Sequence, residues 1–99
     1  MNWVVDNGVA RIVPVQRFVF DTHKDFSKVT EAVLAAQDAK RVVVDLRRVH
    51  YIDSAALGML LMLREKASAI GKGVSLAVAE GMVRDVLAVA NFQKLFVYE

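Results

Sequence analysis

The strongest structural signal in this 99-residue chain is the segment Val42-Val43-Val44-Asp45-Leu46, followed by Val49-His50-Tyr51-Ile52-Asp53-Ser54-Ala55-Ala56-Leu57-Gly58. Its run of β-branched residues predicts a strand that is buried on both faces, as in a sheet covered by helices. A helix is expected from about Ser54 to Ile70, and the glycine at position 71 can supply the left-handed residue that ends it. A buried strand followed by a helix is typical of α/β domains.

The N-terminal third is expected to form a hairpin and a helix. Two short β-rich runs, Trp3–Val5 and Val9–Val13, flank Asn7-Gly8, a dipeptide suited to a two-residue hairpin turn. A helix is predicted from about Thr22 to Ala39, because apolar residues recur on one face of it. Its start, with Thr22 and Asp25, resembles a capping box.

The C-terminal third continues the alternation of strands and helices. A strand is predicted over Val74–Ala79, then a helix around Met82–Ala90, then a short strand over Leu95–Tyr98. The order β-β-α-β-α-β-α-β implies right-handed crossovers and a mostly parallel sheet. We therefore expect an α/β fold: one domain over residues 1–99, with a mixed sheet of about five strands and helices packed on it.

Composition excludes several functional classes. The 56% of hydrophobic residues permit a packed core, and the net charge of +2 lacks the dense basic stripe of nucleic-acid binders. The chain has no cysteine, so disulfides and thiolate zinc sites are excluded. No apolar run approaches the roughly 20 residues of a spanning helix, and Met1–Asp6 does not resemble a signal peptide. We expect a cytoplasmic protein without membrane insertion.

A helical wheel at 100° per residue gives Ser54 a direction. With Ala55 at zero, an apolar core face falls at roughly 60–140°, formed by Ala56, Leu60, Leu63, Ala67 and Ile70. Ser54 and Gly58 fall at roughly 260–300°, nearly opposite to the core face, while Ala55, Met59 and Met62 lie on one flank. Ser54 is therefore predicted to face solvent at the start of the helix, with little bulk beside it.

An exposed serine at this position suits phosphorylation. A phosphate there would lie at the positive end of the helix dipole, near unpaired N–H groups. It would also add about −1.5 to −2 charges to the surface, which would weaken the docking of a partner. The two residues Asp53 and Ser54 alone favour a purely structural reading, because both types are preferred helix N-caps. Met59 and Met62 also have two readings, as core filler or as an adaptable binding surface.

The wider pattern resembles the STAS domain family, and is similar to the anti-sigma factor antagonists of bacterial partner-switching systems. The shared features are the buried strand ending in Asp45-Leu46, a short loop, and the D-S-x-x-L-G segment that begins at Asp53. The resemblance implies that Ser54 is phosphorylated by a serine-kinase anti-sigma factor, which binds the unphosphorylated form. A phosphatase would restore Ser54, and the free antagonist would release a client by competing for the kinase.

The chain departs from that family in two places. Ala56 stands where the family usually has glycine, and the loop from Phe20 to His23 differs from the family's G-x-L-D segment, although Asp21 could match its aspartate. The expected partner-binding residues are those around the serine: Asp21, His23, Asp53, Ala55, Leu57, Gly58, Met59 and Met62. The difference in the loop leaves the identity of the partner open.

Two other functional classes stand as alternatives. In the first, the chain is a STAS subunit of a lipid-transport complex or a signalling scaffold, where Ser54 caps a helix or contacts a stable partner. In the second it is an enzyme, which no phosphate-binding glycine loop, nucleophile elbow or metal motif supports. His23 and His50 lack ligand spacing, so they are interpreted as loop or interface residues. No catalytic residue, metal or cofactor is expected.

Overall fold

The computed structural model describes all 99 residues. The helices and strands are β1 (Asn2–Asp6), β2 (Val9–Val13), β3 (Gln16–Phe18), α1 (His23–Ala35), β4 (Arg41–Asp45), β5 (Val49–Ile52), α2 (Ser54–Ala69), β6 (Gly73–Ala77), α3 (Met82–Val89) and β7 (Val97–Tyr98). Two 3-10 turns complete them, η1 (Phe20–Thr22) and η2 (Phe92–Lys94).

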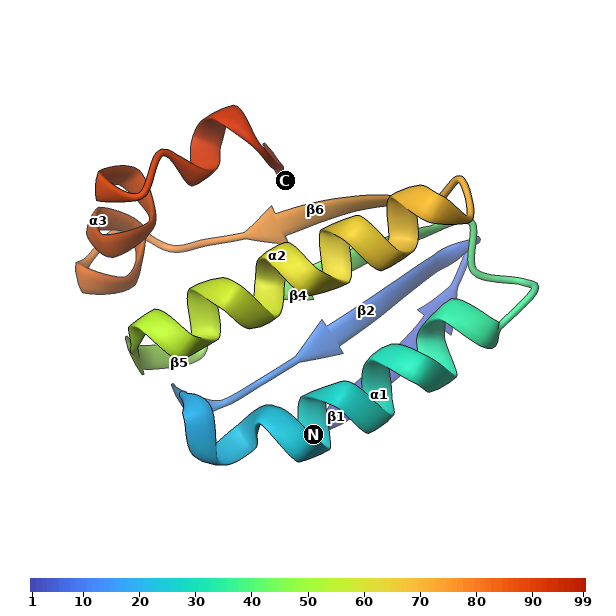
Figure 1. Ribbon diagram of the computed structural model, residues 1–99, viewed down its shortest axis with the longest axis horizontal. Helices are drawn as coiled ribbons and strands as arrows, with labels where there is room; N and C mark the ends of the chain where they lie inside the picture. Colours follow the sequence, from blue (N-terminus) through green and yellow to red (C-terminus); the bar gives the residue numbers. More distant parts are fainter.

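A mixed five-stranded sheet with the order β1-β2-β4-β6-β7 forms the centre of the structure. The pair β1–β2 is antiparallel, and the other three neighbouring pairs are parallel. Figure 1 shows α1 and α2 lying side by side on one face of this sheet, with α3 beyond the end of β6. The α/β class, the mixed sheet of five strands and the helices packed on it are therefore confirmed.

The opening hairpin forms as the Asn7-Gly8 dipeptide predicts. Both residues have positive φ angles, 52° and 79°. Such angles are required at both central positions of the turn that matches the twist of two antiparallel strands. The turn fixes the register between β1 and β2, which pairs Trp3 with Ile12 and Val5 with Ala10.

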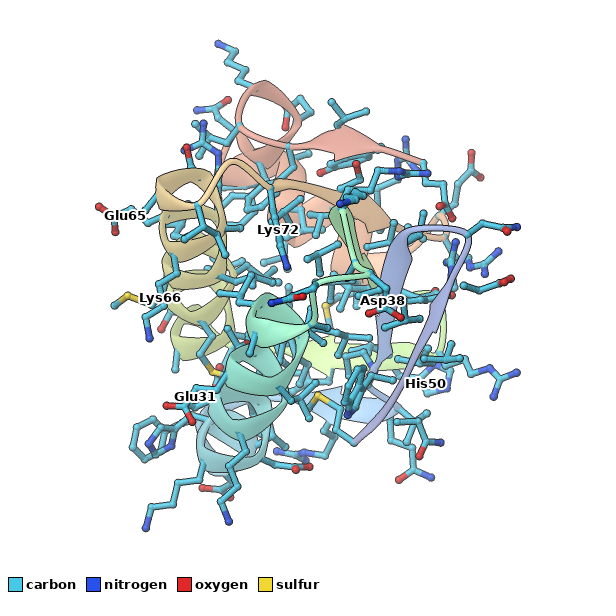
Figure 2. All side chains as sticks on the ribbon, turned by 90° about the vertical axis from the view of Figure 1, so that its right-hand side faces the viewer. Glu31, Asp38, His50, Glu65, Lys66 and Lys72 are labelled. Carbon is cyan, nitrogen blue, oxygen red and sulfur yellow. The ribbon has the colours of Figure 1, made fainter.

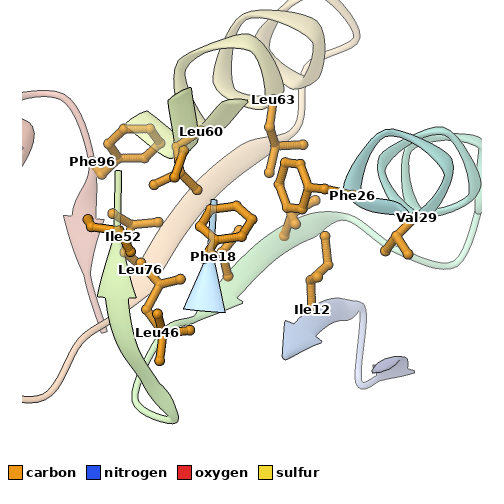
Figure 3. Packing of buried hydrophobic residues seen from close by; sticks show 14 of the residues in the cluster. Ile12, Phe18, Phe26, Val29, Leu46, Ile52, Leu60, Leu63, Leu76 and Phe96 are labelled. Carbon is orange, nitrogen blue, oxygen red and sulfur yellow. The ribbon is translucent and has the colours of Figure 1, made fainter. Parts of the chain in front are cut away.

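Strand β4 lies between β2 and β6 and is buried on both faces. Val42, Val43 and Val44 have no exposed surface, which confirms the reading of this run. Figure 3 shows the core that forms between the sheet and the helices, where Ile12 and Leu76 from strands meet Phe26, Leu60 and Leu63 from α1 and α2. The core positions the start of α2 firmly against the sheet.

The prediction of the core face is wrong for one residue. Ala56, Leu60, Leu63 and Ala67 are buried as the wheel indicates, but Ile70 is 53% exposed. Ile70 is the C-cap of α2 and no longer has helical backbone angles, with φ −115° and ψ 18°. A wheel assumes constant rotation per residue, so it fails where the helix ends.

The sequence pattern did not indicate a second, two-stranded parallel sheet formed by β3 and β5. It also extended the first helix too far, to Ala39, whereas α1 ends at Ala35. The carbonyl groups of Leu34 and Ala36 bind the ammonium of Lys72, each at 2.9 Å. This contact comes from a residue far along the chain, so local periodicity could not reveal it.

The capping box predicted from Thr22 and Asp25 does not form. Thr22 is the N-cap of α1, but its side chain makes no capping hydrogen bond there. Its hydroxyl instead donates to the Val19 carbonyl at 2.7 Å and accepts from the Val19 amide at 3.3 Å. Thr22 therefore closes the η1 turn that precedes α1.

Candidate functional site

The N-terminus of α2 is capped by Asp53. One carboxylate oxygen accepts a hydrogen bond from the Ala56 amide at 2.9 Å, and the other accepts from the Phe20 amide at 3.1 Å. Partial burial raises the pKa of Asp53, but the hydrogen bonds from the Ala56 and Phe20 amides outweigh it and hold the pKa below its ordinary value. Asp53 therefore remains ionised near neutral pH and joins α2 to η1.

Ser54 is the first residue of α2 and its side chain faces solvent. Because Asp53 does the capping, the Ser54 hydroxyl takes no part in the hydrogen bonding of the helix start. Gly58, one turn later, is also exposed, and a Cβ added there would meet no atom within 4 Å. The direction that the wheel assigns to both residues is confirmed.

A groove of about 530 Å³ runs between α1 and α2. It is lined by residues from η1, α1 and α2, which are Phe20, His23, Phe26, Ser27, Thr30, Ala55, Gly58, Met59, Met62, Leu63 and Lys66. Five of the eight expected partner-binding residues are among them: His23, Ala55, Gly58, Met59 and Met62. The fold thus brings the first turns of both helices to one surface beside Ser54.

The other three expected residues lie around this groove rather than in it. Asp21 is exposed on η1, and Asp53 lies beneath the turn as the cap described above. Leu57 points to the other flank of α2, where it lines a shallower apolar hollow with α3 residues that include Met82 and Val89. The predicted residues therefore form two surfaces, one on each side of the Ser54 turn.

Phe20 and His23 form the end of the groove near Ser54. Their rings stack with centroids 4.8 Å apart, and His23 Nδ1 donates to the Phe20 carbonyl at 3.0 Å. Phe20 remains 59% exposed, which is unusual for an aromatic side chain tied down by neighbours. The stacking and the Asp53 contact together hold this loop in place.

The sequence pattern did not nominate six groove residues, namely Phe20, Phe26, Ser27, Thr30, Leu63 and Lys66. Phe26 and Thr30 read as core positions of the α1 stripe, and both are buried. The sequence offers one signal, an aromatic residue at position 20 in the loop between a strand and a helix; its exposure is seen only in the structure. Lys66 could be placed only by knowing how α1 packs on α2.

Aspartates elsewhere in the chain do not make a metal site. No group of three or more potential metal ligands of the His, Cys, Asp or Glu types comes together. Asp45, at the end of β4, is instead held by two arginines, with Arg47 at 2.7 Å and Arg11 at 3.2 Å. The hydrogen bonds from Arg47 lower the pKa of Asp45 to about 2, against the opposing effect of burial.

Comparison with known proteins identifies relatives over most of the chain. Residues 17–98 match a family model described as "Mlab, STAS domain". A curated STAS-domain containing protein of Pseudomonas aeruginosa (strain UCBPP-PA14) is 48% identical over 80 residues, which is 81% of this chain and 77% of that protein.

Solved structures share the fold at lower identity. A candidate anti-sigma factor antagonist from Thermotoga maritima superimposes with a TM-score of 0.86 at 21% identity, covering 99% of this chain and 85% of its own. The anti-sigma factor antagonist SpoIIAA in its unphosphorylated form gives 0.76 at 13% identity (99% and 86%). A sulfate transporter family protein from Wolinella succinogenes gives a TM-score of 0.79 at 20% identity, covering 96% of this chain and 80% of its own.

None of the helices has the length and apolar character needed to cross a membrane.

Proposed function

We propose that this chain, which belongs to the STAS domain family, is an anti-sigma factor antagonist controlled by phosphorylation of Ser54. In the unphosphorylated form it binds a serine-kinase anti-sigma factor, and the phosphorylated form releases that partner. A phosphatase returns the protein to the binding form. The chain acts in this scheme as a binding module and as the substrate of the kinase, not as an enzyme.

The observation that carries the proposal is that Asp53, and not Ser54, caps α2. The Ser54 hydroxyl makes no hydrogen bond at the start of the helix and is exposed to solvent. If Ser54 itself capped the helix, its modification or replacement would cost the protein about 0.5–2 kcal/mol of stability. Modification of Ser54 therefore leaves the fold intact, which a reversible switch requires.

A phosphate on Ser54 would change the surface strongly. It would lie in the first turn of α2, where the helix dipole tolerates negative charge. Beside it stands the ionised Asp53, whose pKa is held below its ordinary value. The added charge of about −1.5 to −2 would repel an acidic partner surface. Against an apolar partner surface, docking would have to remove water from the phosphate, which costs free energy.

The surfaces next to Ser54 suit a docking partner. The groove side offers Ala55, Gly58, Met59 and Met62, and the opposite flank offers Leu57 with the apolar residues of α3. Methionine side chains adapt to varied partner shapes. We assign the partner contacts to these residues together with Asp21, His23 and Asp53.

The test is a binding assay with the cognate kinase, comparing Ser54→Ala with Ser54→Asp. We expect Ser54→Ala to bind like the wild type and Ser54→Asp to lose binding. Incubation of the wild-type protein with kinase and ATP should yield one phosphate, located on Ser54 by mass spectrometry. Equal binding by the two variants, or equal phosphate incorporation by Ser54→Ala, would remove the switch from the mechanism.

A control separates the switch from misfolding. Both variants should unfold in urea within about 0.5 kcal/mol of the wild type, because the replaced hydroxyl bonds nothing in the helix. Ser68 provides a matched site, since it is an exposed serine on the same helix, four turns away from Ser54. Ser68→Asp should leave kinase binding unchanged.

A second candidate function rests on the family model, whose description names Mlab. In this reading the chain is a STAS subunit of a lipid-transport complex or a signalling scaffold, and the Ser54 surface is a stable interface. Purification of the protein from its host discriminates between the two. A transporter ATPase present in equal amount would favour the subunit, whereas a kinase that dissociates on addition of ATP would favour the switch.

A further inference from the structure

The groove between α1 and α2 has the dimensions of a small-molecule site. On α2 its lining residues recur along one face from Ala55 to Lys66, a rise of about 16 Å at 1.5 Å per residue. Its volume of about 530 Å³ falls inside the range of about 300–1,000 Å³ that ligand pockets occupy. The groove therefore follows about three turns of α2, a length that suits an extended chain.

Most of the lining is apolar. The walls are made by Phe20, Phe26, Ala55, Met59, Met62 and Leu63. The two methionines are flexible enough to move aside for a guest, and Gly58 leaves one wall without a side chain. An apolar chain would gain free energy here by leaving water.

Thr30 is a polar exception within this lining. Its side chain is only 5% exposed, and its hydroxyl Oγ1 has no hydrogen-bond partner. A buried hydroxyl without a partner costs free energy, which a polar atom entering the groove would relieve. The unpaired hydroxyl therefore favours a ligand that places an acceptor, such as a carboxylate oxygen, beside Thr30.

The positive charge of Lys66 favours an anionic ligand. Lys66 is the only lysine or arginine in the lining, which contains no acidic residue. No ion pair engages its ammonium, although Figure 2 shows Glu31 of α1 on the same outer side of the molecule. Because α1 and α2 run in the same direction (Figure 1), Thr30 and Lys66 both belong to the later turns of the helices, away from Ser54.

We propose that this groove binds a long-chain carboxylate, with its head group at Lys66 and Thr30 and its apolar chain running toward Phe20. The Lys66 ammonium and the Thr30 hydroxyl donate to the carboxylate oxygens, and the methionine and phenylalanine side chains cover the chain. The site does not depend on phosphorylation of Ser54, so its test is independent of the proposed function.

The test uses dodecanoate and its uncharged methyl ester as probes, each below its aggregation concentration. They are titrated into ¹⁵N-labelled protein, and the amide shifts are followed by NMR. We expect saturable shifts confined to the groove faces of α1 and α2, with dodecanoate binding about tenfold more tightly than the ester. Lys66→Gln should remove that preference, whereas Lys28→Gln, an exposed α1 lysine outside the groove, should keep it.

Thr30→Val provides a second variant of nearly the same shape. It removes the unpaired hydroxyl, so the free protein should unfold at a higher temperature while the affinity for dodecanoate falls severalfold. A hydroxyl without a role in binding would give the higher stability with unchanged affinity, which would overturn the assignment of Thr30.

Three results would overturn the proposal as a whole. The first is the absence of saturable shifts. The second is equal affinity of the wild type for dodecanoate and its ester, which would mean that no head group is recognised. The third is a shift of the same groove amides with protein concentration alone, which would assign the groove to a second copy of the chain.

Discussion

The Asp53 carboxylate accepts a hydrogen bond at 3.1 Å from the backbone amide of Phe20, a residue 33 positions earlier in the chain. The same side chain caps α2 through the Ala56 amide at 2.9 Å. One aspartate therefore fixes both the start of the helix that carries Ser54 and the loop that carries Phe20. The relative position of these two surface residues depends on it.

Replacing Asp53 tests this relationship. Asp53→Ala removes the cap and the link to Phe20, so we expect a loss of about 1–2 kcal/mol in the free energy of unfolding, measured in urea. Asp53→Asn should lose much less, because asparagine is an equally good cap. Asp21→Ala, at an exposed aspartate that makes no hydrogen bond with its side chain, is the control. An Asp53→Ala protein as stable as the wild type would refute the role.

Asp45 predicts a dependence of stability on pH. Its pKa in the folded protein is about 2, below the unfolded value of about 3.8, because Arg47 and Arg11 bind the carboxylate. A depressed pKa stabilises the fold above the unfolded value, and this contribution is lost as the pH falls from about 4 to about 2. We expect it to be on the order of 1–2 kcal/mol, since Arg47 is largely exposed.

The measurement compares the wild type with Asp45→Asn in urea at pH 7, 4 and 2. The wild type should be more stable at pH 7 and at pH 4, and the difference should shrink toward zero at pH 2. The other carboxylates titrate in both proteins and cancel in this comparison. A difference that stays constant over this range would show that the charge of Asp45 contributes nothing.

Gly58 predicts a conflict between stability and docking. It lies inside α2 in open space, so Gly58→Ala should stabilise the protein by about 0.5–1 kcal/mol through helix propensity. The same methyl group stands one turn from Ser54, so under the proposed function we expect weaker binding of the kinase. Urea unfolding and a binding titration of the same variant measure both effects. A variant that is more stable and binds equally well would exclude Gly58 from the interface.

Lys72 is expected to stabilise the end of α1, although it lies far from this helix in the sequence. Its ammonium binds the carbonyl groups of Leu34 and Ala36, each at 2.9 Å. Lys72→Met keeps most of the side-chain volume but removes both bonds, and we expect the protein to lose about 1–2 kcal/mol in urea. Lys28→Met, at an exposed lysine, should change stability by less than about 0.5 kcal/mol. Similar losses in the two variants would count against the role of Lys72.

Several features of the site could be predicted because they depend on local order along the chain. The burial of the valine run, the Asn7-Gly8 turn and the outward direction of Ser54 follow from strand alternation, turn chemistry and helical rotation. The structure bears out each of them. Local sequence preferences and tertiary packing agree over these segments.

Other features depend on contacts between distant segments. Periodicity extended the first helix to Ala39 and counted Ile70 in the core, because it carries no information on where a helix stops. The second sheet gives no signal in the sequence because β3 has only three residues, too few to show an alternating pattern.

The sequence by itself determined the class of fold and placed Ser54 at the start of a helix, since both follow from spacings of a few residues. Only the tertiary structure decided that Asp53 rather than Ser54 is the cap, and that Asp53 also holds Phe20. Only the tertiary structure shows that His23, Met59 and Lys66 line one groove. The physical reason is that the Phe20 contact and the groove form when α1 packs beside α2 on the sheet, and no local pattern encodes that packing.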